Sequence, residues 1–152
     1  MKDFKAIIFN VGNAQFGMDI QRVFSIDRMD RITILPNLPP YMKGVADLRG
    51  EVVPVMDLRY FLSEYDYLQE TSNTQIITIK IHDRVIGLIV DIANDVVDIS
   101  SATIQKPDFH DIDLSFVLGI SIINEDLLIL LDIDNLLSNA ADLEELLQRL
   151  DV

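Results

Sequence analysis

The sequence predicts an all-β fold of two pseudo-symmetric β-barrels packed together, with short helical turns and a C-terminal α-helix. Two observations support this prediction. Short apolar runs rich in Ile and Val alternate with turn signals along most of the 152 residues, and β-branched side chains pack well on a pleated sheet. The segment 44–62 of the first half also recurs in the second half as 119–137, which indicates a duplicated structural unit.

The predicted strands follow one another with little helix between them. The Arg49-Gly50 pair between two apolar runs predicts a hairpin, because glycine supplies a positive φ at the turn. Pro54 in the second run favours an edge strand or a bulge. The segment 21–29 fits a strand, with a helical turn as the alternative. Strands are expected at 4–11, 16–20, 21–29, 44–48, 51–56, 75–81, 85–91, 95–99, 115–123 and 127–132.

The C-terminal segment 139–151 has the pattern of an amphipathic helix. Leu143, Leu146, Leu147 and Leu150 follow the i, i+3, i+4, i+7 spacing of one helix face. Asn139 is a suitable N-cap for this helix. We expect the leucine stripe to pack on the protein's own barrels, with binding of a partner as the alternative.

The internal repeat aligns 44–62 with 119–137. Eight further positions are apolar in both copies, and Gly17 aligns with Gly87 when the opening hairpins of the two copies are compared. We therefore expect a single domain over 1–152, with barrel one at about 16–63 and barrel two at about 75–138, while strands near either terminus are free to cross over. The recurring Asp57 and Asp132 are predicted N-caps of a helical turn after each unit. Three pairs are identical in the two copies: Gly44/Gly119, Asp57/Asp132 and Leu62/Leu137.

Composition and charge exclude several function classes. The net charge is −13, so the chain would repel nucleic acid and anionic membrane surfaces. The charge fits either general solubility or a basic protein partner. There is no Cys, and no apolar run approaches the roughly 20 residues of a membrane span. An acidic residue near the N-terminus argues against a signal peptide, so we expect a cytoplasmic protein without direct membrane insertion.

The sequence contains no recognisable active site. Its two histidines, His82 and His110, are in turn-like or polar segments without a nucleophile motif beside them. Their Asp neighbours at 83 and 111 resemble solvated turn residues more than metal ligands, and the glycines do not form a phosphate-binding loop. We therefore expect no catalytic residue, no cofactor and no metal. An enzyme that uses acidic side chains such as Asp57 is the alternative.

Two features indicate a protein-binding surface instead. Arg49 stands at a hairpin turn of a very acidic chain, and arginine is frequent at interfaces; the alternative is that it neutralises nearby carboxylates. Ile20, Val23 and Ile26 recur at every third position, which does not fit one face of a flat strand. At least one of them is expected to face solvent, with core packing as the alternative.

The stretch from Pro39 to Arg59, PPYMKGVADLRGEVVPVMDLR, resembles the signature of the CheW-like family. In that family a proline loop precedes Gly-Val-Ile-Asn-Leu-Arg-Gly and then Val-Ile-Pro-Val-Ile-Asp-Leu-Arg. The segment FGMDI at 16–20 is similar to the family's opening hairpin, and 85–91 and 127–132 are similar to its second half. The resemblance covers about 4–137 and implies two five-stranded SH3-like barrels.

The resemblance also implies a function. CheW-like proteins are adaptors that couple methyl-accepting chemoreceptors to the histidine kinase CheA in membrane-associated arrays. The receptor's cytoplasmic hairpin tip packs near the junction of the barrels, and the kinase's CheW-like regulatory domain pairs barrel to barrel. Carried onto this chain, the receptor-binding residues would be Ile20, Val23, Gly44 and Arg49. The end of the second barrel would face the kinase.

Two positions depart from the family pattern and bear on receptor specificity. Ser25 stands where the family usually has Glu, so a Glu–Arg pair with Arg49 is lost. Asp47 stands where the family has Asn. Either Asp27 or Asp47 is a substitute partner for Arg49. The alternatives to a stand-alone adaptor are the coupling part of a CheV-type protein, which would need a receiver domain after the barrels, and a purely structural oligomer.

Overall fold

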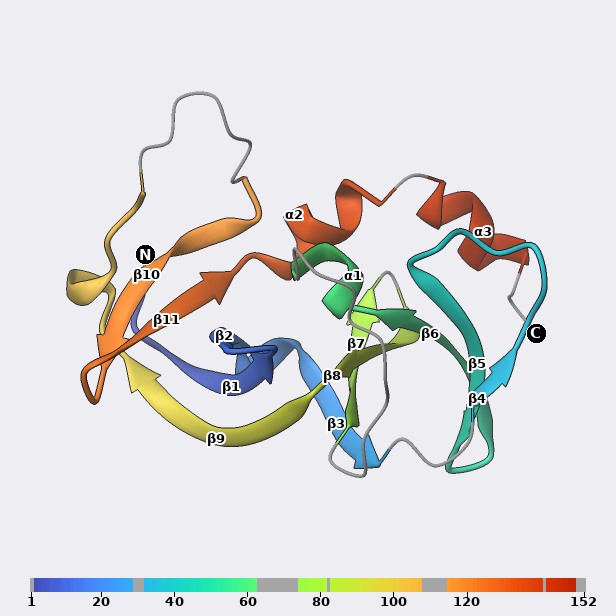
Figure 1. The fold of residues 1–152 in the computed structure, drawn as a ribbon, viewed down its shortest axis with the longest axis horizontal. Helices are drawn as coiled ribbons and strands as arrows, with labels where there is room; N and C mark the ends of the chain where they lie inside the picture. The colour runs from blue at the N-terminus through green and yellow to red at the C-terminus, as the bar shows by residue number, and fades with distance from the viewer. Residues whose placement is uncertain are drawn as a thin grey trace.

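The computed structural model describes residues 2–28, 32–62, 74–81, 83–107, 115–140 and 142–149. It confirms the all-β prediction, because most of the described residues form strands of two sheets (Figure 1). The first, termed the terminal sheet, has the spatial order β10 (Val117–Ile123), β11 (Asp126–Leu131), β2 (Ala14–Asp19), β1 (Phe4–Val11) and β9 (Ile92–Ile99). The second, termed the middle sheet, has the order β3 (Val23–Arg28), β7 (Gln75–Ile81), β8 (Arg84–Val90), β6 (Glu51–Asp57), β5 (Met42–Leu48) and β4 (Ile32–Ile34).

The sequence repeat corresponds to a structural repeat. β5 and β6 occupy the same places in the middle sheet as β10 and β11 in the terminal sheet, and β8, β7 and β3 match β2, β1 and β9. Only β4 lacks a counterpart among the described strands. Each sheet therefore combines the later strands of one copy with the opening hairpin of the other.

This exchange differs from the barrel boundaries that the sequence suggested. β7 and β8, expected within 75–138, pair with strands of the 16–63 segment, and β2 lies in the other sheet. The exchange depends on two parallel pairings, β6 with β8 and β11 with β2. The apolar pattern of a strand shows which faces are buried but does not name the neighbouring strand.

Glycines mark both parallel pairings. Val55 pairs with Gly87, and Leu130 pairs with Gly17. A Cβ at Gly87 would lie 2.8 Å from Cγ2 of Ile76, and one at Gly17 would lie 3.1 Å from Cδ2 of Leu130. The aligned glycines of the repeat are therefore sites where side chains of neighbouring strands pack against bare backbone.

The two copies also share their hairpin turn. Arg49 and Gly50 have φ values of 54° and 84°, and Asn124 and Glu125 have 51° and 73°. Positive φ at both central residues defines a type I′ turn, whose twist matches that of the flanking strands. The predicted hairpin at Arg49-Gly50 is confirmed and has an equivalent between β10 and β11.

Short helices end each copy. Asp132 caps α2 (Ile133–Ser138) by accepting a hydrogen bond from the Asn135 amide at 3.2 Å. Asn139, expected to start the C-terminal helix, is instead the C-cap of α2, and α3 (Leu143–Arg149) begins only after it. The expectation was wrong because the leucine stripe begins only at Leu143 and does not specify where the helix starts; the chain breaks between the two helices at Asp142, whose φ is 62°. The remaining helices are η1 (Ile20–Arg22), α1 (Arg59–Leu62) and η2 (Ser101–Thr103).

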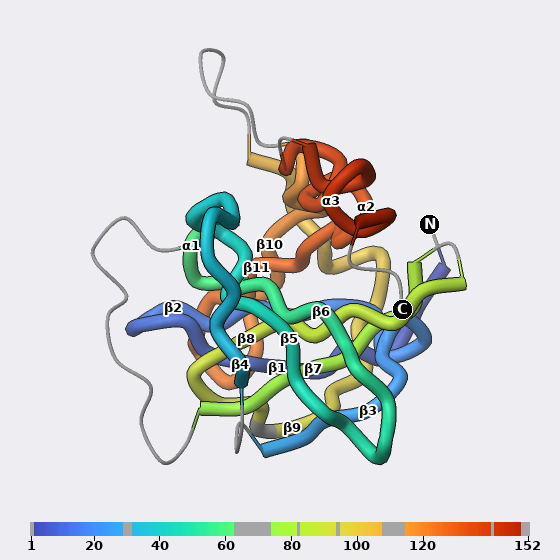
Figure 2. The backbone as a smooth tube through the Cα atoms, turned by 90° about the vertical axis from the view of Figure 1, so that its right-hand side faces the viewer, coloured from blue at the N-terminus to red at the C-terminus, as the bar shows by residue number. Residues whose placement is uncertain are grey.

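Helix α3 packs on the protein itself, as expected. Leu143 and Leu147 are buried, and Leu146 is partly buried against the same cluster; Leu150 lies outside the described residues. Both views show α2 and α3 together along one side of the molecule (Figure 1, Figure 2).

One large apolar cluster joins the two sheets and these helices. It contains residues of the terminal sheet such as Phe9 and Met18, residues of the middle sheet such as Met56 and Leu88, and Leu137 of α2. Two smaller clusters belong to one sheet each. Because the main core is shared, neither sheet can lose its partner without exposing this core to water.

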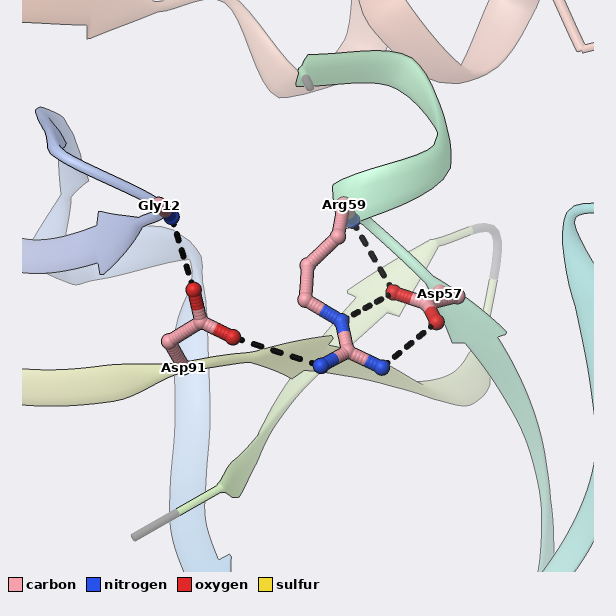
Figure 3. A network of polar contacts seen from close by, with 4 residues as sticks. All are labelled: Gly12, Asp57, Arg59 and Asp91. Atoms are coloured by element: carbon pink, nitrogen blue, oxygen red, sulfur yellow. Dashed lines mark hydrogen bonds and ion pairs between the residues drawn. The ribbon is translucent and has the colours of Figure 1, made fainter. Parts of the chain in front are cut away.

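A buried ion-pair network crosses the junction between the sheets (Figure 3). Arg59 at the start of α1 donates from Nε and Nη2 to the two carboxylate oxygens of Asp57, at 2.8 and 2.9 Å. Its Nη1 donates to Asp91 at 3.3 Å, and Asp91 accepts a hydrogen bond from the Gly12 amide at 2.7 Å. Asp57 ends a strand of the middle sheet, and Gly12 lies in the turn between β1 and β2 of the terminal sheet. The network thus links the two sheets.

The network keeps the guanidinium charged. Arg59 and Asp57 are 2% and 1% exposed, so each ion has lost nearly all its contact with water. The hydrogen bonds to Asp57 raise the pKa of Arg59 from its ordinary value, although burial acts in the opposite direction.

The second copy has a related contact with the charges reversed. In the alignment of 44–62 with 119–137, the counterpart of Arg59 is Asp134 in α2. Asp134 accepts from Nη2 of Arg22 at 2.6 Å, and Arg22 lies in η1, the connection between β2 and β3. Asp91 lies in the corresponding connection between β8 and β9. Each connection that passes from one sheet to the other is therefore held by an ion pair to a helix.

The buried network predicts a specific loss of stability. Replacing Arg59 by Met leaves the Asp57 carboxylate buried without a counter-charge, so the free energy of unfolding should fall by about 3–5 kcal/mol. Urea denaturation measures this change. The control is Arg149→Met, which removes an exposed pair with Glu145 and should cost less than about 0.5 kcal/mol. Equal losses in the two variants would contradict the role given to burial.

Candidate partner-binding site

Arg49 lies at the tip of the β5–β6 hairpin, where it contacts the edge strand β3. Its Nη2 donates to Asp27 at 2.6 Å and its Nη1 donates to the Ser25 hydroxyl at 3.2 Å. Of the two carboxylates expected as substitute partners, Asp27 makes this contact. Asp47 instead accepts from the Gly50 amide at 3.0 Å and stabilises the hairpin turn.

Ser25 connects the Arg49 pair to the interior. Its hydroxyl donates to the second oxygen of Asp27 at 2.7 Å and also contacts the hydroxyl of Thr78. Thr78 is only 1% exposed. The carboxylate of the ion pair is therefore held by hydrogen bonds that reach a buried residue, although 59% of the Arg49 side chain is exposed.

The other expected receptor contacts lie in different surroundings. Ile20 and Val23 are partly buried and pack against the shared core, so most of their surface is used internally. Ile26, from the same spacing of every third position, is 39% exposed. The spacing is explained by η1, which contains Ile20 and turns the chain before β3 begins, and by the irregular pairing of β3 between Val23 and Ser25.

Gly44 is buried and has a structural reason to be glycine. Its φ is 153°, and a Cβ there would lie 2.0 Å from the carbonyl oxygen of Thr33 on β4. Gly119, its counterpart, is similarly close to Ile104 and Gln105. Both glycines let a neighbouring segment approach the first strand of the hairpin.

Phe24 was not among the residues expected at the surface, and it is 59% exposed. Phe24 borders a hollow of about 160 Å³ beside the Arg49 hairpin tip. Its aromatic character was visible in the sequence, but the sequence alone does not show which face of β3 is exposed. The hollow is lined by Phe24, Leu48, Arg49, Glu51, Val53, Thr78 and Val85.

The terminal sheet carries an exposed pair of apolar residues. Ile122 and Leu127 face each other across the β10–β11 hairpin and are 60% and 62% exposed. At the equivalent place on the β5–β6 hairpin, Val52 pairs with the charged Asp47. Of the two equivalent hairpins, only β10–β11 presents an apolar pair here.

A groove of about 750 Å³ runs between η1, the end of β7 and the helices α2 and α3. Arg22 and Lys80 line one part of it, and the acidic residues of α3 and the preceding turn line another. The groove lies beside the Arg22–Asp134 ion pair, at the connection that crosses between the sheets.

The described residues show no feature of a metal site or a membrane span. No group of three or more His, Cys, Asp or Glu among them is placed to hold a metal ion. None of the helices in the described ranges has the length and apolar character needed to cross a bilayer. His82 and His110 lie outside the part of the chain that the structure describes.

Comparison with known proteins identifies the family. The family model of the CheW-like domain matches residues 5–141. The chain belongs to the CheW-like family. It is 35% identical to the chemotaxis protein CheW of Klebsiella aerogenes, over 88% of this chain and 81% of that protein. It is 39% identical to the chemotaxis protein CheW of Bacillus subtilis, over 67% of this chain and 65% of that protein.

A solved structure agrees with this assignment. The scaffolding protein TtCheW from Thermoanaerobacter tengcongensis is 28% identical and superposes with a TM-score of 0.75, covering 87% of this chain and 86% of that one. The predicted resemblance to the CheW-like family and the two-sheet fold are both confirmed. This CheW-like chain therefore belongs to the class of chemotaxis scaffold proteins.

The packing around Gly44 makes a prediction for this CheW-like fold. Gly44→Ala forces a methyl group against the Thr33 backbone, which cannot rotate away, so it should lower the free energy of unfolding by about 1–3 kcal/mol. The control is Gly17→Ala, whose methyl group meets the flexible end of Leu130 at 3.1 Å. Its cost should be about 1 kcal/mol or less. Urea-denaturation midpoints that rank the two variants in the opposite order would contradict this account.

Proposed function

We propose that this protein couples methyl-accepting chemoreceptors to the histidine kinase CheA by binding both. The observation that carries the proposal is the match to the CheW-like family over residues 5–141. The proposed function requires no catalytic reaction by the protein. Its function is to hold two partners in a fixed arrangement, inside the cell and at receptor arrays that it joins through these partners.

The receptor side of the proposal is the region of Arg49, Ile20 and Val23. Arg49 is exposed and held in one position by Asp27 and Ser25, which reduces the entropy lost when a partner contacts it. Ile20 is the first residue of η1 and Val23 follows its last, where the chain passes from the terminal to the middle sheet. Gly44 supports this region by allowing β4 to approach β5 and need not contact the receptor itself.

The kinase side of the proposal is the β10–β11 hairpin of the terminal sheet. Ile122 and Leu127 together expose apolar surface on a rigid two-strand support. Apolar residues at the centre of an interface contribute strongly when they are removed from water. The family resemblance implies a barrel-to-barrel contact with the kinase, and this hairpin is suited to that contact.

The receptor assignment predicts separable losses of binding. In co-sedimentation with receptor-bearing membranes, Arg49→Ala and Val23→Thr, which keeps the shape of a side chain that also packs on the shared core, should each weaken binding about tenfold or more, because each removes an interface group. Binding to purified CheA should remain within about twofold of the unmodified protein. Receptor binding unaffected by both substitutions would refute the site.

The kinase assignment predicts the opposite pattern. The double variant Ile122→Ser/Leu127→Ser should weaken CheA binding by about tenfold or more, because apolar contact area is lost. Receptor co-sedimentation should be retained. The matched control is Val52→Ser, at the counterpart of Leu127, which should leave CheA binding unchanged. Titration calorimetry with the purified kinase measures both, and equal effects of the two changes would exclude the hairpin as the kinase surface.

A further inference from the structure

We propose that Phe24 and the hollow beside it form a socket for one large aliphatic side chain of the chemoreceptor tip, with a basic residue next to that side chain. The inference rests on the proposed function and specifies the receptor chemistry that this chain recognises. It is supported by a bulge in β3, by the difference between the two copies of the repeat, and by the charges at the rim of the hollow.

Phe24 lies on the solvent-facing side of β3. Residues of this strand alternate between partly buried and exposed, and Phe24 is 59% exposed. It also stands at a bulge, because Val23 pairs with Ile79 on β7 and Ser25 pairs with Thr78, which leaves Phe24 without a partner residue in the register. The strand is an edge strand of the middle sheet.

The other copy of the repeat shows that the fold requires the bulge but not the phenylalanine. On β9, Ala93 pairs with Phe9 and Asp95 pairs with Ile8, so Asn94 is skipped in the same way. Asn94 is the counterpart of Phe24 in the alignment that matches Gly17 with Gly87. The same bulge therefore accommodates a polar residue. The bulge therefore does not require the aromatic side chain in the middle sheet, and Phe24 is not isolated there, because Leu48, Val53 and Val85 line the same hollow.

The hollow has room for one side chain. Leu48, Val53 and Val85 line it together with Phe24, and its volume is about 160 Å³. For comparison, an engineered apolar cavity of about 150 Å³ binds benzene. The counterpart of Val85 in the terminal sheet is Gln15, so this apolar wall is also particular to the middle sheet. A leucine, isoleucine or methionine side chain matches the size and character of this space.

The charged residues at the edge of the hollow indicate which charge the receptor should carry beside the inserted side chain. Arg49 and Glu51 both line the hollow, but Arg49 is already paired with Asp27 at 2.6 Å. Glu51 is exposed and belongs to a chain with a net charge of −13. Opposite charges across an interface favour association, so a lysine or arginine beside the inserted side chain is the complementary choice.

The test measures binding to membrane vesicles that carry a methyl-accepting chemoreceptor. Phe24→Asn introduces the residue that the equivalent bulge already tolerates, and it should raise the dissociation constant about tenfold or more. Val85→Gln, which introduces the residue at the counterpart position, should weaken binding in the same direction. The control is Val96→Asn, a residue 44% exposed on β9 of the terminal sheet, and it should change binding less than twofold.

Charge reversal tests the second half of the proposal. Glu51→Lys should weaken vesicle binding several-fold, with a larger effect at low salt. The counterpart substitution Asp126→Lys should not. Thermal midpoints and CheA binding of all variants should match those of the unmodified protein.

The outcomes separate this inference from the proposed function. If the unmodified protein binds the vesicles and Phe24→Asn and Val85→Gln bind as tightly, the socket is refuted while the coupling function stands. If Glu51→Lys and Asp126→Lys have equal effects, the basic neighbour is refuted. If the unmodified protein does not bind the vesicles at all, the proposed function fails and the socket fails with it.

Discussion

The structure depends on the two places where the chain passes between its sheets, and on the ion pairs that hold them. At the connection between β8 and β9, Asp91 accepts from Arg59, which is itself buried against Asp57. At the connection between β2 and β3, Arg22 donates to Asp134. Of these two contacts, the Arg59 network is the buried one, and its loss therefore leaves an uncompensated charge inside the protein. Because each sheet uses the opening hairpin of the other copy, separating the two copies would break two parallel strand pairings, and separating the two sheets would expose the shared core.

This arrangement suits a protein that links others. The proposed receptor surface at Arg49 lies on the middle sheet, and the proposed kinase surface at Ile122 and Leu127 lies on the terminal sheet. A shared core and a buried cross-link give the two surfaces a fixed relative orientation. The two copies share most of their strands, their hairpin turns and their bulges while differing in many side chains, so each surface is able to recognise a different partner on one scaffold. Phe24 against Asn94, and Asp47–Val52 against Ile122–Leu127, are among the positions where the copies differ.

Much of the fold could be predicted from the sequence because its signals are local. The type I′ turn at Arg49-Gly50, the cap at Asp132 and the recurrence of 44–62 at 119–137 all depend on neighbouring residues or on comparison of the chain with itself. The exchange of hairpins could not be predicted, because burial patterns do not specify which strands pair. Asp57 was interpreted as a cap, and it does accept from the Arg59 amide at 3.0 Å. Its part in the network that links the two sheets could not be predicted, because the sequence does not show that Asp91 lies next to Arg59. Phe24 was missed because the alternation along β3 does not show from the sequence alone which face of the strand meets solvent.

The Arg59 network is the contact that couples the stability of the two sheets. Hydrogen exchange of backbone amides, compared between the unmodified protein and Arg59→Met, tests it most directly. The account predicts faster exchange in Arg59→Met both around α1 in the middle sheet and in β1, β2 and the Gly12 turn of the terminal sheet, since the network ends at the Gly12 amide. Faster exchange confined to α1 and β6, with the terminal sheet unchanged, would contradict it.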